Sequence, residues 1–239
     1  SGRDCAEVCT LLSGLAVVYQ ESFMYEEAIE NFEEALRIAK IVYGPRTTKA
    51  AHIIRCMAEL YHEQELLDKS LDLFFVTYKI YQDVYKRSTD FCHYGPDSGN
   101  VADMLHSIAM IYHKKKDIDK TVYYYSATLF IRELVFGRQS KEVADILNNV
   151  ASVHQGIGRI SEALEYYNYA LDIRKKVHGA ESKEVADVLY NIGVLFKEAK
   201  DIPKAFQFFT RCHEVRLAIY KSDHPELADA LYCLGILCK

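Results

Sequence analysis

The sequence predicts an all-α fold, an α-solenoid in which helix–turn–helix units stack one after another. The first observation is a nine-residue stretch at 143–151 that returns every 42 residues with the same order of apolar, small and acidic positions. Its other copies lie at 101–109, 185–193 and 227–235. A fixed period in this range is the signature of stacked repeats. The second observation is that only 4 prolines and 11 glycines occur among 239 residues, which leaves long stretches free to form helix.

Each period contains the pattern of two helices separated by a turn. After Val143, apolar residues recur at helical spacing from Leu147 to Ala151, and Gly156 then interrupts the pattern. A second apolar run covers 163–177 and ends at Gly179, in a place where a glycine that closes a helix is common. The sequence therefore predicts one helix pair for each period.

The period places five full repeats and a final lone helix in one domain at 3–239, after a tag remnant at 1–2. The expected repeats are 9–50, 51–101, 102–143, 144–185 and 186–227, with a partial unit at 228–239. Ser182 is the expected N-cap of a first helix, because its hydroxyl can accept a hydrogen bond from the first turn. In the last unit Pro225 stands at the expected first turn of the helix, where the missing backbone N–H of a proline costs little stability.

The second repeat is longer than the others because it contains an insertion. Its second helix is expected to end near Lys86, and residues 87–100 then replace a short loop. Gly95 and Pro96 predict a loop or a brief helical extension there. Insertions in a solenoid often carry function. Lengthening a surface loop also costs little entropy, so the insertion can equally be a tolerated one.

Small and large residues alternate at fixed positions in both helices of every unit. In the first helices the small positions are Ala16, Ala58, Ala109, Ala151, Gly193 and Gly235, and the large positions are Tyr19, Tyr61, Tyr112, His154 and Phe196. In the second helices the aromatic positions are Phe32, Phe74, Tyr125, Tyr167 and Phe209. A large side chain that faces a small residue on a neighbouring helix allows two helices to pack closely.

This alternation resembles the tetratricopeptide repeat, and the resemblance covers nearly the whole chain. The 42-residue period, with segments such as 170–179 (ALDIRKKVHG), resembles the kinesin-light-chain subclass. The resemblance implies a right-handed solenoid whose first helices line a concave groove that binds an extended peptide of a partner protein. It also implies a link to cargo, the cytoskeleton or cilia. Similar repeats occur in unrelated scaffolds, and a fold does not fix a function.

Carried onto this sequence, the resemblance predicts peptide contacts along the inward face of the first helices. The expected peptide-binding residues are His106, Asp145, Asn148, Asn149, Asp187, Tyr190, Asn191 and Tyr232. Asn149 and Asn191 occupy a position where related repeats use an asparagine to hold the ligand backbone, since an amide both donates and accepts hydrogen bonds. The alternative is an asparagine that bonds its own helix or a neighbouring one.

Aspartates follow the same period through the C-terminal half of the chain. They are Asp103, Asp145, Asp187 and Asp229. One interpretation is an acidic binding surface that selects a basic or hydroxyl-bearing partner. The other is a structural role for this column of aspartates, because each lies in the first turn of a helix, where the helix dipole favours negative charge. Arginines repeat with the same period at Arg132, Arg174 and Arg216. We therefore favour the structural interpretation, with Asp–Arg pairs between stacked helices.

Composition and motifs argue against several other classes of protein. A net charge of −5 provides no basic stripe for nucleic acid, and no apolar run reaches the ~20 residues of a membrane span. The sequence has no Gly-rich phosphate loop, GxSxG or HExxH motif, so we expect no enzyme activity and no cofactor. His52, His62, His106 and His113 lack the i, i+4 spacing of a helical zinc pair, so we expect no metal site. Seven scattered cysteines without a CxxC pair predict reduced thiols in the cytoplasm.

These observations predict a non-enzymatic adaptor or scaffold that binds an extended segment of another protein. One alternative is a structural module that self-associates through its C-terminal helix. Leu231, Leu234, Ile236 and Leu237 predict an apolar stripe there with no following helix to cover it, and solenoids need a polar outer cap. The same stripe predicts a fragment of a longer protein, in which the repeats can also serve as a regulatory arm.

Overall fold

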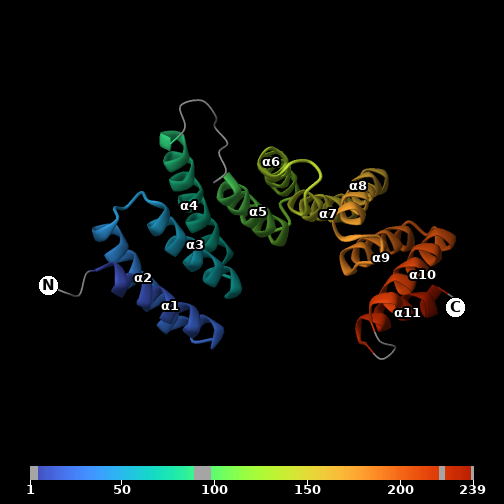
Figure 1. The fold of residues 1–239 in the computed structure, drawn as a ribbon, viewed down its shortest axis with the longest axis horizontal. Coiled ribbons are helices and arrows are strands. Elements are labelled where there is room, and N and C mark those ends of the chain that lie inside the picture. Colours follow the sequence, from blue (N-terminus) through green and yellow to red (C-terminus); the bar gives the residue numbers. More distant parts are fainter. Residues whose placement is uncertain (1–4, 89–97, 221–223, 238–239) are drawn as a thin grey trace. The chain divides into compact units, whose positions relative to one another are not determined.

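The computed structural model describes residues 5–88, 98–220 and 224–237, and every regular element in these ranges is an α-helix (Figure 1). The eleven helices described are α1 (Ala6–Glu21), α2 (Tyr25–Val42), α3 (Thr48–Glu63), α4 (Leu67–Ser88), α5 (Ser98–Lys114), α6 (Ile118–Phe136), α7 (Lys141–Gly156), α8 (Ile160–His178), α9 (Lys183–Glu198), α10 (Ile202–Ile219) and α11 (Glu226–Leu237). The predicted all-α fold is confirmed. None of these helices combines the length and apolar character needed to cross a bilayer.

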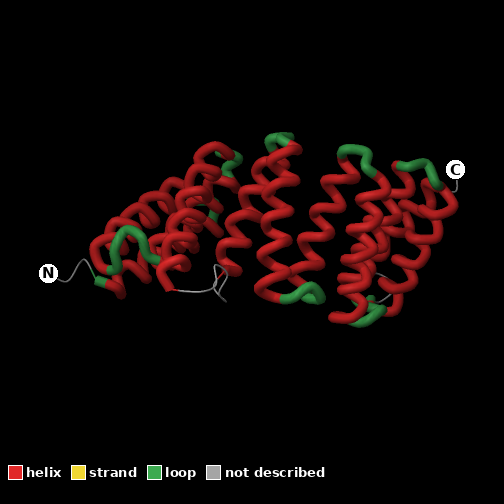
Figure 2. Tube along the Cα trace, turned by 90° about the horizontal axis from the view of Figure 1, so that it is seen from above, coloured by secondary structure: helices red, strands yellow, loops and turns green. Residues whose placement is uncertain are grey.

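The helices pack as pairs that follow one another along the chain. Helix α1 packs on α2, α3 on α4, α7 on α8 and α9 on α10. The second helix of a pair also contacts the first helix of the next, as α8 contacts α9 and α10 contacts α11. Figure 2 shows the short turns that join neighbouring helices. The first helices begin two to four residues before the expected repeat starts, for example at Lys141 and Lys183, so the predicted period is present with a small offset.

The chain divides into two compact units, Ser1–Tyr124 and Tyr125–Lys239. The first unit holds α1 to α5 and the start of α6, and the second holds the remainder of α6 and α7 to α11. Each unit has its own apolar cluster. Phe32, Ile38 and Leu60 are fully buried in the first unit. Leu147 and Phe209 are fully buried in the second.

Side-chain caps explain where several first helices begin. The hydroxyls of Thr47, Ser140 and Ser182 accept hydrogen bonds from the backbone N–H groups three residues later, at 3.4, 3.3 and 3.3 Å. These bonds satisfy donors that a helix N-terminus otherwise leaves unpaired. The predicted cap at Ser182 is confirmed. Helix α8 is followed by Gly179 with a φ of 90°, a conformation that glycine adopts without strain.

The alternation of small and large residues accounts for the packing inside each pair. Ala151 and Ala163 have no exposed surface, and Tyr167 is buried in the same cluster. The helices approach closely at Gly193, where an added Cβ would lie 2.8 Å from the ring of Phe209. The small positions therefore set how closely the helices of a pair approach.

Of the insertion expected at 87–100, Arg87 and Ser88 belong to α4 and residues 98–100 begin α5, while 89–97 lie outside the described residues.

The expected C-terminal stripe is only partly exposed. Leu234 and Leu237 pack against the apolar cluster of the second unit, whereas Leu231 and Ile236 are exposed. The prediction was wrong for Leu234 and Leu237 because one face of α11 is used to contact α10.

Candidate functional site

Seven of the eight predicted peptide-binding residues lie in the second unit, on the first helices α7, α9 and α11. Asp145, Asn148 and Asn149 lie on α7, Asp187, Tyr190 and Asn191 on α9, and Tyr232 on α11. All seven are exposed or half-buried. We call these seven residues the first-helix face. His106 is half-buried on α5 in the other unit and is not part of the first-helix face.

A hydrogen bond between two asparagine side chains joins α7 to α9. The Nδ2 atom of Asn191 donates to Oδ1 of Asn148 over 2.9 Å. Nearer the ends of the same helices, Gln155 donates to Glu198 over 2.7 Å. The structural alternative for Asn191, a bond to a neighbouring helix, is therefore present. Each amide can still make further hydrogen bonds, because it has two N–H groups and two acceptor lone pairs.

The two aspartates of this face are already engaged by arginines of the second helices. Arg174 on α8 donates to the Asp145 carboxylate over 3.0 Å and to the backbone carbonyl of Glu184 on α9 over 2.9 Å. Each such arginine thus ties together three successive helices. The structural interpretation of the Asp column is confirmed at this pair, and the carboxylate is at least partly neutralised by its partner.

The same arrangement recurs one repeat later. Arg216 on α10 donates to Asp187 over 3.1 Å and to the carbonyl of Glu226 on α11 over 2.8 Å. Its side chain is almost fully buried. A buried guanidinium requires compensation by charge and hydrogen bonds, and Asp187 and the Glu226 carbonyl provide it. Asp187 is therefore poorly placed to act as a free acidic contact for a ligand.

Tyr190 is held between three neighbours. Its ring lies edge-to-face with Phe209 at a centroid separation of 5.5 Å, and the guanidinium of Arg216 lies 5.5 Å from its centroid. Its hydroxyl lies 3.6 Å from Sγ of Cys233 on α11. This hydrogen bond is the largest cause that raises the pKa of Tyr190 to about 12, and burial adds to it. The phenol therefore stays neutral at physiological pH and can donate a hydrogen bond.

Tyr232 is the most exposed aromatic residue of the first-helix face, with 71% of its surface accessible. The face therefore presents three amides, one fixed phenol and one exposed phenol, while its aspartates are paired with arginines. Such a surface can hydrogen-bond a polypeptide backbone and hold an apolar side chain. It contains no placed nucleophile beside a base, and no group of three or more potential metal ligands gathers anywhere in the described ranges.

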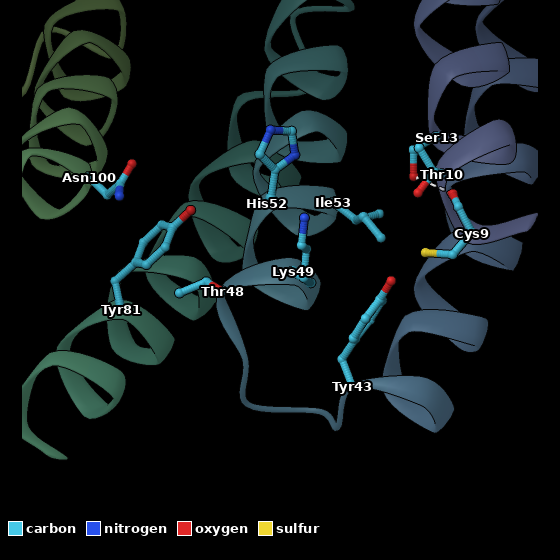
Figure 3. Close-up of a pocket in the computed structure, with 10 residues that line it drawn as sticks. All are labelled: Cys9, Thr10, Ser13, Tyr43, Thr48, Lys49, His52, Ile53, Tyr81 and Asn100. Atoms are coloured by element: carbon cyan, nitrogen blue, oxygen red, sulfur yellow. Dashed lines mark hydrogen bonds between the residues drawn. The ribbon is translucent and has the colours of Figure 1, made fainter. Parts of the chain in front are cut away.

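The first unit contains a separate hollow of about 380 Å³ around the start of α3 (Figure 3). Lys49 and His52 of α3 lie at its centre, with Thr10 and Ser13 of α1 on one side and Tyr81 of α4 on the other. Its remaining lining residues are Cys9, Tyr43, Thr48, Ile53 and Asn100. None of the lining residues is acidic. We call this cavity the α3 N-terminal hollow.

A second hollow of about 280 Å³ lies at the other end of α3. Its lining residues are Gln20 of α1, Glu59, His62 and Glu63 of α3, Phe74 of α4, and Ser107 and Met110 of α5. We call it the α3 C-terminal hollow. The peptide contacts expected from the sequence begin at His106, so neither hollow of the N-terminal half was predicted. Lys49, three residues before His52 and so on the same helix face, was the available signal.

Comparisons with known proteins agree with this architecture. The family model described as tetratricopeptide repeat matches residues 7–83, 100–176 and 142–218. Comparison with the sequences of curated proteins gave no match. Among solved structures, BtubC (BKLC) from P. vanneervenii aligns with a TM-score of 0.71 and 22% identity, over 89% of this chain and 81% of that one.

Two further solved structures show the same fold. A putative kinesin light chain from Podosopora anserina with nearly identical TPR-like repeats aligns with a TM-score of 0.73 and 14% identity, over 91% of this chain and 100% of that one. Aspartyl phosphate phosphatase F from Bacillus subtilis aligns with a TM-score of 0.76 and 14% identity, over 96% of this chain and 55% of that one. At these identities the likeness shows the fold alone. Because the family model matches most of the sequence, this chain belongs to the tetratricopeptide repeat family.

Proposed function

We propose that the chain is a non-enzymatic adaptor that binds an extended segment of a partner protein on the first-helix face of α7, α9 and α11. Tetratricopeptide repeats are protein-interaction scaffolds, and this gives the general class of function. The observation that carries the specific proposal is the hydrogen-bonded pair Asn148–Asn191, flanked by Tyr190 and by the exposed ring of Tyr232.

The chemistry of this face suits a polypeptide better than a small ion. The amides of Asn148 and Asn191 keep unused hydrogen-bonding capacity toward a peptide backbone. Tyr232 offers a large apolar ring with a polar tip, the kind of side chain that often dominates binding energy at interfaces. The paired state of Asp145 and Asp187 means that selection by charge is weak on this face. Asn149 and His106 remain proposed contacts on the same grounds of position.

The class of partner that we propose is a cargo or cytoskeletal component, in the cytoplasm or at a cilium. The support is the fold likeness to a putative kinesin light chain and the 42-residue period of the sequence.

The direct test is affinity purification of the intact chain followed by mass spectrometry and a binding isotherm for each recovered partner. Asn148→Ala combined with Asn191→Ala removes both amides without leaving one of them unpaired. We expect this variant, and Tyr232→Ala, to weaken the partner at least about tenfold, a loss of roughly 1.4 kcal/mol. Asn168→Ala on α8 is the matched amide control, since Asn168 is exposed on a second helix.

Equal affinity for the wild type and both variants would exclude the first-helix face as the binding surface. Thermal unfolding of each variant must be recorded alongside, because a lost interhelix hydrogen bond lowers stability by ~1 kcal/mol. A variant that keeps its melting temperature and loses the partner supports the proposal directly.

Self-association through α11 is the second candidate function. Leu231 is 50% exposed and Ile236 is 43% exposed, next to Tyr232 on the same helix. Sedimentation velocity across a wide range of concentration separates the two functions. A mass that rises with concentration for the wild type and stays constant for Leu231→Ser supports self-association, whereas a constant mass for both excludes it.

A further inference from the structure

One side of α1 exposes apolar residues at positions that are buried in the later first helices α3, α5, α7 and α9. Leu11, Leu15 and Val18 lie at i, i+4 and i+7 on α1, with 71%, 43% and 56% of their surface accessible. We call these three residues the α1 stripe. The equivalent residues of the four later helices are at most 7% exposed, and they are Ile53, Met57, Leu60, Met104, Ile108, Ile111, Ile146, Val150, Val153, Val188, Ile192 and Leu195.

Within the first unit, a helix covers these positions where they are buried. Helix α3 packs on α2, and Ile53, Met57 and Leu60 belong to the same apolar cluster as Ile38 and Ala39 of α2. Among the described residues, no helix takes this place on α1. Because the side chains of the α1 stripe recur at helical spacing, the surface that fits on them is one face of an α-helix.

The α1 stripe is bounded by negative charge. Glu7 lies four residues before Leu11, and Glu21 lies three residues after Val18, so both carboxylates lie on the same side of α1 as the stripe. Both are exposed, and neither forms an ion pair within the described ranges. Residues 5–36, which include most of α1 and α2, contain seven glutamates and no lysine, arginine or histidine. This part of the surface therefore attracts basic side chains.

An aromatic residue stands in the turn that follows α1. Phe23 is 77% exposed and has a φ of 59°, a left-handed conformation that is unfavourable for a residue with a Cβ. The equivalent turn positions hold Glu65, Lys116 and Lys200, with φ values of 60°, 59° and 60°. Phe23 therefore adds apolar surface at the C-terminal end of α1, in a place where the other units carry a charged residue or a glycine.

The same charges make a second copy of this chain a poor fit for the α1 stripe. Two α1 helices packed on each other in either direction would bring Glu7 and Glu21 of one copy close to those of the other, and like charges repel. Helix α11 also exposes apolar residues, but its first turn carries Glu226 and Asp229 and its last turn has no basic residue. A partner with basic groups is the better complement.

We propose that the α1 stripe binds a basic amphipathic helix of a partner protein, which takes the place on α1 that α2 has on α3. Apolar residues of this helix pack on Leu11, Leu15 and Val18, and lysines or arginines beside them pair with Glu7 and Glu21. The α1 stripe shares no residue with the two hollows or with the first-helix face. The site is therefore independent of the function proposed above, and it takes a helix where the first-helix face takes an extended segment.

The test begins with a library of helical peptides displayed on yeast. The apolar positions are those of α8, which packs on the equivalent first helix α9, and every other position is random. We expect peptides selected on the intact chain to be enriched in lysine and arginine relative to the starting library. The best peptide is then synthesised with a fluorophore and measured by fluorescence polarisation. Leu15→Ser should weaken it at least about tenfold, and Glu7→Gln combined with Glu21→Gln should weaken it and reduce its dependence on salt.

Matched variants separate the α1 stripe from other surfaces. Leu217→Ser on α10 removes an apolar side chain that is 51% exposed, and should leave binding unchanged. Glu162→Gln combined with Glu165→Gln on α8 removes two exposed carboxylates and should also have no effect. Phe23→Lys introduces the residue type of the equivalent turns and should weaken the peptide without unfolding the protein.

Tyr232→Ala should leave this peptide unaffected, so that failure of the first-helix face and failure of the α1 stripe are distinguished. A selection that enriches no peptide, enriched peptides without an excess of basic residues, or an affinity unchanged by Leu15→Ser would each overturn the proposal. Sedimentation equilibrium tests the other occupant. A wild-type mass that rises with concentration, and that Leu15→Ser holds constant, would assign the stripe to a second copy instead. The three stripe residues are exposed, so polar substitutions there are compatible with folding, and circular dichroism verifies it.

Discussion

His154 shows how one residue departs from the rule of its repeat. The equivalent position in other first helices holds a tyrosine or phenylalanine, as at Tyr112 and Phe196. His154 is only 7% exposed, and its Nδ1 has no hydrogen-bond partner in the described structure. Its ring centroid lies 5.3 Å from that of Tyr166, much as Phe196 stacks on Phe208. The histidine therefore fills an aromatic position and leaves a polar atom unsatisfied, which costs about 1–3 kcal/mol.

We predict that His154→Phe stabilises the protein, and that the gain increases as the pH falls. Burial lowers the pKa of His154. Below about pH 6.5 the unfolded chain binds a proton at this residue that the folded chain does not, so the wild type loses stability as the pH falls. The phenylalanine variant lacks this loss. Urea unfolding at pH 5 and pH 7.5 measures the difference in free energy of unfolding between the variant and the wild type. His178→Phe, at an exposed position, is the control. A gain that is the same at both pH values would contradict the prediction.

At the scale of the helix pair, one glycine allows a close contact between α9 and α10. The small position of a first helix is alanine at Ala16 and Ala151 but glycine at Gly193. An added Cβ at Gly193 would lie 2.8, 2.9 and 3.1 Å from three ring atoms of Phe209, which is fully buried. Glycine in a helix interior is destabilising by roughly 0.5–1 kcal/mol relative to alanine. Its presence here is explained by the close approach of α9 and α10.

We predict that Gly193→Ala destabilises the protein by about 1–3 kcal/mol, because overpacking outweighs the better helix propensity of alanine. Gly235→Ala on α11 is the control. No atom lies within 4 Å of its Cβ position, so this variant should be neutral or slightly stabilising. Chemical unfolding of both variants measures the difference. A stable Gly193→Ala protein would mean that α9 and α10 can separate at little cost.

The sequence predicted the helix pairs well because their signals are local. Ser182 marks a helix start through its own hydroxyl, and the Arg174–Asp145 pair follows from a period shared by both residues. Features that depend on several helices were missed. The α3 N-terminal hollow forms where α1, α3 and α4 meet, so the spacing of Lys49 and His52 on one helix could mark a shared face but not a cavity. From the sequence, Leu237 is expected to be uncovered because no helix follows it. In the structure it packs against the apolar cluster of the second unit.

At the scale of the whole molecule, the helices within each compact unit make their main contacts with their neighbours in sequence. Helix α9 packs on α8 and α10, and α10 packs on α9 and α11. Stability in such a repeat array is close to a sum of local terms and interfaces between neighbours. The consequences of a core substitution should therefore decline with distance along the chain, unlike those in a protein with one central core.

We predict that Phe209→Ala weakens α9, α10 and α11 while leaving α1 and α2 unchanged. Phe209 has no exposed surface, and truncating a buried phenylalanine costs about 3–5 kcal/mol. Native-state hydrogen exchange should show faster exchange in the three C-terminal helices only. Phe206→Ala, an exposed position on the same helix, controls for the loss of an aromatic ring as such. Faster exchange throughout the chain would show that both compact units unfold as one cooperative body, and that the nearest-neighbour description of this array is wrong.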